Sequence, residues 1–268
     1  MTVPMLEVRQ VSRRFATRGG RSGSATWALR GVSLQVPTGR TLGVVGESGS
    51  GKSTLARLLV ALDTPTEGEI LHQGVRIDGR RERELRGFRR SVQMVFQDPM
   101  SSLDPRMRVH DILAEPLRAL GLVADEAEQV RQLLVTVGLP PEAARRYPHQ
   151  FSGGQRQRIA IARALGPSPQ VLVADEPVSA LDVSVRAAIL NLLRHLVREL
   201  NLTMVFISHD MGVVRHLCDE IAVLRHGELI EHRPASEIFA APREQYTREL
   251  LAASPRIRPW APGGGSSR

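Results

Sequence analysis

Two glycine-rich turns in this chain stand directly ahead of helix-periodic stretches, and both carry residue types that bind phosphate. The first is GESGSGKST at residues 46–54, which follows the apolar run TLGVV at 41–45. The second is FSGGQ at 151–155, which leads into RQRIAIARAL at 156–165. Free backbone N–H groups at a helix N-terminus bind anions, and the helix dipole adds to the attraction. The sequence therefore indicates two anion sites in one chain.

The first turn matches the pattern G-x-x-x-x-G-K-[ST], in the strand–turn–helix context that this motif requires. Gly46, Gly49 and Gly51 allow the backbone to fold back with its N–H groups around the phosphates. Lys52 is expected to reach the β- and γ-phosphates, and the Ser53 hydroxyl to ligate Mg²⁺. We therefore predict a nucleotide site formed by Gly46, Glu47, Ser48, Gly49, Ser50, Gly51, Lys52, Ser53 and Thr54.

A nucleoside triphosphatase of this type needs a carboxylate on a neighbouring strand, and QVLVADEP at 170–177 supplies one. The apolar run is typical of a buried parallel strand. Asp175 then lies at the carboxyl end of the strand, where open α/β sheets bind their ligands. We expect Asp175 to hold Mg²⁺, and Glu176 to orient and deprotonate the attacking water.

Two more predicted strands end in polar residues. LTMVFISHD at 202–210 ends in His209, and SVQMVFQDP at 91–99 ends in Gln97. Parallel strands end at the same edge of a sheet, so we expect His209 to contact the γ-phosphate. The amide of Gln97 can accept a hydrogen bond from Mg²⁺-bound water and donate one to the nucleophile.

The second turn is separated from the first by predicted helices at 109–121 and 125–138 and a shorter helical stretch at 141–147. A projecting helical lobe is not expected to fold back onto its own phosphate loop. Ser152 and its neighbours would instead contact a nucleotide held by another molecule. Two chains arranged head to tail would then share two nucleotides in a closed, symmetric dimer.

Together, GESGSGKST, Gln97, FSGGQ, VLVADE, SALD at 179–182 and His209 resemble, in this order, the motifs of the ATP-binding-cassette (ABC) ATPases. The resemblance implies that the ligands are ATP and Mg²⁺. It also implies that Asp182 belongs to a loop linking the two sites. By the same resemblance, the residues that contact ATP across the dimer are Ser152, Gly153, Gly154 and Gln155.

The aromatic residue that stacks on adenine in this family corresponds to Phe15, although a core phenylalanine is the alternative. The family usually has tyrosine there, and the insert-like segment at 16–26 makes the alignment ambiguous at this point.

The expected fold is α/β: a P-loop core with a mixed sheet, an antiparallel β subdomain at residues 3–36, and an inserted helical subdomain at about 98–165. We expect the ATPase domain to cover 1–232. A short helical appendage and flexible tail would follow at 233–268.

The net charge of +8 raises the question of a nucleic-acid partner. Lys52 is the only lysine, and the arginines alternate with acidic residues, as in RRERELRGFRR at 80–90. The use of arginine in place of lysine is typical of codon bias, and its alternation with acidic residues is typical of a solvated mixed-charge surface. We therefore expect no nucleic-acid partner. The sequence shows no apolar run of the roughly 20 residues that a membrane-spanning helix needs and no secretion signal. We expect a cytoplasmic location and a buried, unpaired Cys218.

Four segments resemble the oligopeptide, dipeptide and nickel importer branch of the family: 95–117, 150–165, 176–193, and the tail motif 242–255 with Tyr246. This resemblance implies a peripheral ATPase on the cytoplasmic face of the cell membrane. Its partners would be separate transmembrane permeases, a second cassette (the same chain or a paralogue) and, indirectly, a solute-binding protein. We expect the permease contact at residues 100–108. The alternatives are a lipid or lipoprotein exporter and a nucleic-acid-acting ATPase.

Overall fold

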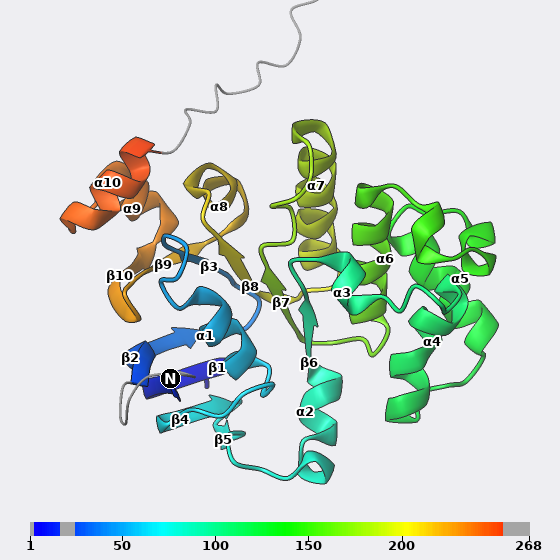
Figure 1. Cartoon of the computed structure of the whole chain (residues 1–268), viewed down its shortest axis with the longest axis horizontal. Helices are drawn as coiled ribbons and strands as arrows, with labels where there is room; N and C mark the ends of the chain where they lie inside the picture. The colour runs from blue at the N-terminus through cyan, green and yellow to red at the C-terminus, as the bar shows by residue number, and fades with distance from the viewer. Residues whose placement is uncertain (1–2, 17–24, 254–268) are drawn as a thin grey trace, which may run out of the picture.

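The computed structural model describes residues 3–16 and 25–253. Its centre is a mixed six-stranded sheet in the order β10-β9-β3-β8-β7-β6 (Figure 1). The five strands from β9 to β6 are mutually parallel, and β10 pairs antiparallel with β9. The strands are β3 (Thr41–Val45), β6 (Val92–Val95), β7 (Val171–Asp175), β8 (Thr203–Ser208), β9 (Glu220–Arg225) and β10 (Glu228–Pro234).

The central strands are buried on both faces, which explains their nearly continuous apolar sequences. Leu172 of β7 packs into one hydrophobic cluster, and Val173 packs into the cluster on the opposite face. Val45 of β3 pairs with Ser208 of β8, and Asp175 of β7 pairs with Ile207. The parallel strands therefore end nearly level, and this common edge carries the polar residues singled out in the sequence.

An antiparallel sheet in the order β2-β1-β4-β5 packs below the mixed sheet. It consists of β1 (Leu6–Ala16), β2 (Ala25–Val36), β4 (Glu67–His72) and β5 (Val75–Arg76). The predicted antiparallel segment at 3–36 is confirmed as β1 and β2, which pair with each other. The strands β4 and β5 were not predicted, because EGEILH has only two consecutive buried apolar residues.

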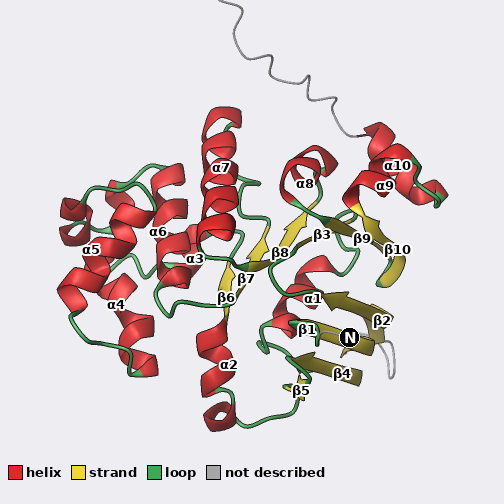
Figure 2. Cartoon of the chain, turned by 180° about the vertical axis from the view of Figure 1, so that it is seen from behind, coloured by secondary structure: helices red, strands yellow, loops and turns green. Residues whose placement is uncertain are grey.

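The helices cover the faces of the mixed sheet and extend beyond its β6 edge (Figure 2). The expected helix after the phosphate loop is present and covers Lys52–Leu59. The short predicted helix at 141–147 is a 3₁₀ turn over Pro141–Arg145. The helices are α1 (Lys52–Leu59), α2 (Arg86–Ser91), α3 (Pro99–Ser102), α4 (Val109–Leu120), α5 (Glu126–Thr136), α6 (Gly153–Leu165), α7 (Val183–Glu199), α8 (Met211–Leu217), α9 (Ala235–Ala240) and α10 (Gln245–Ala253).

The C-terminal helices α9 and α10 lie at the opposite end of the sheet from α4, α5 and α6 (Figures 1 and 2). Ile238 of α9 and Tyr246 of α10 belong to the same hydrophobic cluster as the central strands. The appendage therefore packs on the core. The predicted tail end at 254–268 lies outside the described residues.

Two smaller points complete the fold. Cys218 is buried, as predicted, and packs against Gly43 of β3. Over the described part of the chain, no helix combines the length and the apolar character needed to cross a bilayer.

Candidate functional site

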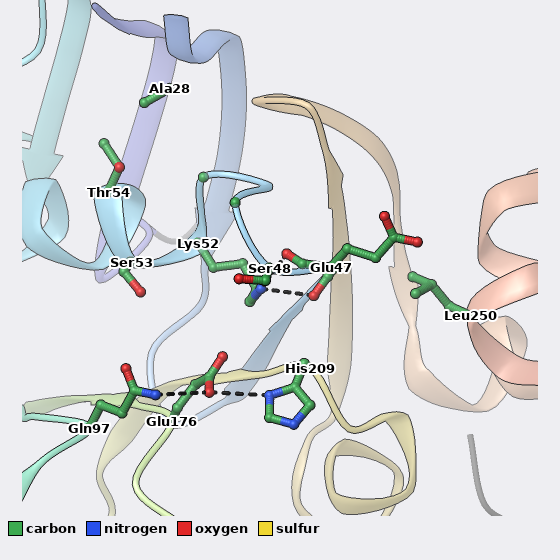
Figure 3. Close-up of a pocket in the computed structure, with 13 residues that line it drawn as sticks. Ala28, Glu47, Ser48, Lys52, Ser53, Thr54, Gln97, Glu176, His209 and Leu250 are labelled. Atoms are coloured by element: carbon green, nitrogen blue, oxygen red, sulfur yellow. Dashed lines mark hydrogen bonds and ion pairs between the residues drawn. The ribbon is translucent and has the colours of Figure 1, made fainter. Parts of the chain in front are cut away.

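A cavity of about 650 Å³ opens at the carboxyl ends of β3, β6, β7 and β8 (Figure 3). It brings the first glycine-rich turn together with the polar residues that end three other strands. The lining residues are Ala28, Gly46, Glu47, Ser48, Gly49, Gly51, Lys52, Ser53, Thr54, Gln97, Glu176, His209 and Leu250.

The glycine-rich turn packs so tightly that side chains are excluded from part of it. Gly51 has φ +105, and a Cβ there would lie 2.4 Å from the carbonyl oxygen of Ala28 on β2. Helix α1 begins directly afterwards and has no side-chain cap on its N-terminal N–H groups. These unpaired N–H groups make the turn a ready anion site.

Lys52 lies inside this turn and is 5% exposed. Its Nζ donates hydrogen bonds to the carbonyl oxygens of Gly46 and Glu47, each at 2.8 Å. Burial lowers the pKa of Lys52, while the nearby charges of Glu176 and Asp175 oppose the shift. An anionic ligand in the turn would relieve this cost, because it would add compensating negative charge.

Asp175 ends β7 behind α1, and its Oδ1 accepts a hydrogen bond from the Ser53 hydroxyl at 3.2 Å. Burial raises the pKa of Asp175, and the hydrogen bond from Ser53 opposes that rise. A carboxylate beside a hydroxyl is an oxygen donor set that suits Mg²⁺. Within the described ranges no group of three or more His, Cys, Asp or Glu side chains could hold a metal ion. Mg²⁺ bound together with a nucleotide needs only one or two protein ligands, since phosphates and water supply the others.

The side chain of Glu176, which follows β7, contacts residues that follow β8 and β6. Its Oε2 lies 3.1 Å from Nδ1 of His209 and 3.3 Å from Nε2 of Gln97, as the dashed lines in Figure 3 show. The backbone of Glu176 has φ +43, in the left-handed region, and its N–H donates to the carbonyl of Ile207. The carboxylate thereby faces the phosphate loop across the cavity.

The second glycine-rich turn lies outside this cavity. Ser152 caps α6: its Oγ accepts from the Gln155 N–H at 3.3 Å, and the Gln155 side chain accepts from the Ser152 N–H at 3.0 Å. Gly154 is needed for packing, since a Cβ there would lie 2.4 Å from Cγ1 of Val185 on α7. None of the four residues from Ser152 to Gln155 lines the cavity.

Asp182 caps the neighbouring helix α7. Its Oδ1 accepts from the Val185 N–H at 2.9 Å and from the Ser184 hydroxyl at 2.8 Å. These two hydrogen bonds lower the pKa of Asp182. The second glycine-rich turn and the start of α7, which follows the SALD segment, therefore meet at Val185. The two elements predicted to contact a second molecule thus form one connected surface.

Phe15 is 43% exposed, so the alternative that it is a core residue is wrong. The guanidinium carbon of Arg13 lies 4.6 Å from the centre of its ring. Phe15 does not line the cavity, and its predicted contact with adenine stays a prediction. The insert-like segment next to it lies, except at its two ends, outside the described residues.

Three residues that the sequence did not suggest as site residues contribute to the site. Ala28 of β2 and Leu250 of α10 line the cavity, and Tyr246 of α10 bonds the phosphate loop. Ala28 and Leu250 carry no functional group, so no motif could have indicated them. Tyr246 belongs to the tail motif, but the sequence gave no reason to connect that motif with the phosphate loop.

The fold and the cavity are those of a nucleotide-hydrolysing cassette, and comparison with known proteins identifies the family. The sequence profile described as "ABC transporter" matches residues 29–179. The chain belongs to the ABC transporter family, and its domain is an ABC ATPase, which binds and hydrolyses ATP.

Characterised relatives cover nearly the whole chain. The chain is 46% identical to the oligopeptide transport ATP-binding protein OppF of Bacillus subtilis, over 95% of this chain and 84% of OppF. It is 49% identical to the glutathione import ATP-binding protein GsiA of Escherichia coli, over 96% of this chain and 42% of GsiA.

A solved structure of the ATP-binding cassette MJ0796, described as a dimeric post-hydrolysis state bound to ADP and Pi, is also similar. It superimposes with a TM-score of 0.77 at 31% identity, over 86% of this chain and 99% of that one. The predicted family, fold and enzyme class are thereby confirmed.

Proposed function

We propose that this chain is the ATP-hydrolysing subunit of an ABC importer that takes up peptides through separate permease subunits. The observation that carries the enzymatic part is the convergence of Gln97, Glu176 and His209 opposite Lys52 in a single cavity. Support for the transported class comes from relatives named for oligopeptide, peptide and glutathione import. Nickel remains the alternative solute.

ATP binding is assigned to the phosphate loop and the start of α1. The backbone N–H groups between Gly46 and Thr54 would surround the phosphates, and Lys52 would exchange its carbonyl partners for phosphate oxygens. Bound Mg²⁺, held by Ser53, Asp175 and Gln97, would neutralise phosphate charge. Each of these residues presents an oxygen atom, which is the ligand type that Mg²⁺ prefers.

Hydrolysis is assigned to Glu176. Its carboxylate would accept a proton from a water molecule while the water oxygen attacks the γ-phosphorus and ADP departs. His209 and Gln97 both contact Oε2, so they fix the direction of this carboxylate. In the same proposal His209 also contacts the γ-phosphate.

The partners follow from the second glycine-rich turn and from the lobe surface. Ser152, Gly153, Gly154, Gln155 and Asp182 would contact the ATP and the linking loop of a second cassette, which is either a copy of this chain or a paralogue. Met100 is 38% exposed and belongs to the candidate permease contact at 100–108. The permeases would hold the chain at the cytoplasmic membrane face, and a solute-binding protein would act on their other side.

The test is reconstitution of this chain in proteoliposomes, together with the permeases and any second cassette encoded beside its gene. We expect ATP-dependent uptake of labelled di- to pentapeptides, and loss of uptake with Lys52→Ala in this chain. Uptake of labelled nickel without peptide uptake would select the alternative solute. ATP-independent uptake, or no loss with Lys52→Ala, would contradict the proposal.

A further inference from the structure

The C-terminal helix α10 is bonded directly to the phosphate loop. The Tyr246 hydroxyl accepts a hydrogen bond from the backbone N–H of Glu47 at 3.1 Å. Tyr246 is only 4% exposed, so this hydroxyl reaches the loop from within the protein. One turn further along α10, Leu250 lines the cavity beside Glu47, as Figure 3 shows.

The bond from Tyr246 matters because of the residue that it holds. The N–H of Glu47 is fixed by Tyr246, and its carbonyl accepts from Lys52 Nζ at 2.8 Å and from the Ser50 N–H at 3.2 Å. When the Lys52 ammonium donates to a phosphate oxygen instead, the Glu47 carbonyl loses its hydrogen bond from Lys52. The bond to Tyr246 does not depend on Lys52 and can keep this part of the loop in place.

The start of α10 is anchored from β10. Glu231 is 6% exposed, and its carboxylate accepts from the N–H groups of Arg243 at 3.1 Å and Glu244 at 3.3 Å. These N–H groups immediately precede α10, so the carboxylate acts on a helix N-terminus, where negative charge is favourable. The segment thus enters the helix at a fixed point.

A cation also fixes the tyrosine ring. The guanidinium carbon of Arg225 on β9 lies 4.6 Å from the centre of the Tyr246 ring. The ring is therefore held by its face while the hydroxyl points at the loop. A helix that served only to cover apolar surface would need neither this orientation nor a hydrogen bond to the loop.

We propose that Tyr246 is a positioning residue for ATP binding, and that α10 forms a wall of the nucleotide site. In this arrangement, ATP in the loop and docking of α10 stabilise each other, so the C-terminal segment responds to the nucleotide state. The inference rests on the proposed use of this cavity for ATP.

The first test is Tyr246→Phe, which removes the hydroxyl but keeps the ring and its contact with Arg225. The matched control is Tyr147→Phe, because Tyr147 is the only other tyrosine of the chain and lies near Arg108 in the helical part. We expect the Kd for ATP, measured on the isolated chain, to rise about 2- to 10-fold in Tyr246→Phe, the usual worth of one hydrogen bond. The control should keep the wild-type Kd.

Steady-state kinetics separate positioning from chemistry. We expect Tyr246→Phe to raise KM for ATP by a similar factor and to keep kcat within about twofold, since Gln97, Glu176 and His209 are untouched. The melting temperature without nucleotide should stay near wild type. If that temperature falls while Kd and KM do not change, Tyr246 has only a structural role, and the proposal is wrong.

Hydrogen exchange tests the wall directly. ATP should slow exchange of the amides of α10 in the wild-type chain, and less so in Leu250→Ala. Leu251→Ala is the control, because its neighbour Leu250 lines the cavity and Leu251 does not. A wild-type chain that does not bind ATP overturns the proposed function. A wild-type chain that binds ATP without protecting α10, and whose Tyr246→Phe variant binds equally well, overturns only this inference.

Discussion

Glu176 owes its direction to a backbone conformation that most side chains avoid. A left-handed φ of +43 at a non-glycine residue costs of the order of 1–3 kcal/mol and persists only where the surroundings enforce it. Here the N–H bond to Ile207 and the side-chain contacts with His209 and Gln97 provide that enforcement. Strain at this residue turns the carboxylate from the end of β7 toward the phosphate loop.

Replacing Glu176 by Gln should separate ATP binding from hydrolysis. The amide has nearly the same shape and can still accept from Gln97, but it cannot take the proton of the attacking water. We expect the hydrolysis rate to fall about 10²–10⁴-fold, the usual contribution of a positioned base. Phosphate release gives the rate, and calorimetry should show that Mg²⁺–ATP binding is retained. Glu199→Gln, an exposed change on α7, is the control, and a wild-type rate in Glu176→Gln would exclude the assignment.

At the residue scale, the sequence predicted those parts of the cavity whose side chains do chemistry. Lys52, Ser53 and Asp175 follow from the chemistry of phosphate and Mg²⁺, and the structure brings them together. Ala28 and Leu250 could not be predicted, because an apolar wall depends on which segments meet in space. Whether Phe15 is a core residue could be decided only from the exposure of its side chain in the structure.

At the scale of elements, helices α6 and α7 pack closely where Gly154 of the second glycine-rich turn meets Val185. Any Cβ on Gly154 would overlap Val185, whereas a Cβ on Gly153 would lie 3.4 Å from Leu181, an ordinary contact distance. Packing therefore requires glycine at Gly154 but not at Gly153. The SGGQ motif alone does not reveal this difference.

This packing predicts that Gly154→Ala destabilises the fold and that Gly153→Ala does so much less. Overpacking of a close contact typically costs about 1–3 kcal/mol, so urea unfolding should show a loss in that range for Gly154→Ala. Adding Val185→Ala should restore part of the loss, since it removes the methyl group nearest to the new Cβ. Equal stability of the two single variants would contradict the proposed contact.

The antiparallel sheet shows where prediction of the fold stopped. The expected antiparallel segment at 3–36 contains the long strands β1 and β2, whose alternation of apolar residues is broken by register shifts, as between Val8 and Val11. The short strand β4 buries only Ile70 and Leu71, and both residues of β5 are exposed, so their own patterns do not predict them. They are placed by pairing, β4 with β1 and β5 with β4. The tail motif was recognised, but its docking depends on the buried carboxylate of Glu231, 12 residues earlier than Arg243.

Glu231 also makes the docking of α10 sensitive to pH. Burial raises the pKa of Glu231, but the hydrogen bonds it accepts outweigh burial and lower the pKa below its usual 4.5. A carboxyl whose folded pKa is lowered contributes stability above pH 4.5, and this stability is lost as the pH falls through the folded value. We expect Glu231→Gln to melt earlier than wild type at pH 7, and the gap to shrink below pH 4.5. Glu237→Gln, at an exposed partner of the same Arg233, should show a smaller gap at pH 7.

Part of the positive charge of the described residues is paired with carboxylates at the surface. Many arginines contact carboxylates, as in the pairs Arg9–Glu69, Arg76–Asp78 and Arg118–Glu126. We therefore predict that ATP turnover does not respond to DNA and that any DNA affinity falls steeply with salt, as non-specific phosphate contacts do. Turnover measured with and without duplex DNA at physiological salt is the test. A several-fold stimulation would favour the nucleic-acid alternative.

The second glycine-rich turn is predicted to act between two molecules. The second turn is exposed at Ser152 and Gln155 and lies outside the cavity of its own chain. The neighbouring SALD segment exposes Asp182 and leaves Val183 81% exposed. The similar cassette MJ0796 is described as dimeric.

We therefore expect Glu176→Gln, which binds ATP without hydrolysing it, to accumulate as an ATP-dependent dimer. Removing one negative charge beside the γ-phosphate also reduces repulsion in the closed state. Adding Ser152→Arg should abolish the dimer, because the larger side chain occupies the space meant for the second molecule's phosphate. Thr136→Arg, on the exposed face of α5, adds the same charge elsewhere and should leave the dimer intact.

The measurement is size-exclusion chromatography with light scattering, with and without Mg²⁺–ATP, on this chain alone and mixed with any cassette encoded beside it. If the natural partner is a paralogue, the homodimer should form only at high concentration, whereas the mixture should readily form a heterodimer. A Glu176→Gln chain that binds ATP but stays monomeric in every mixture would leave the second turn without its proposed ligand.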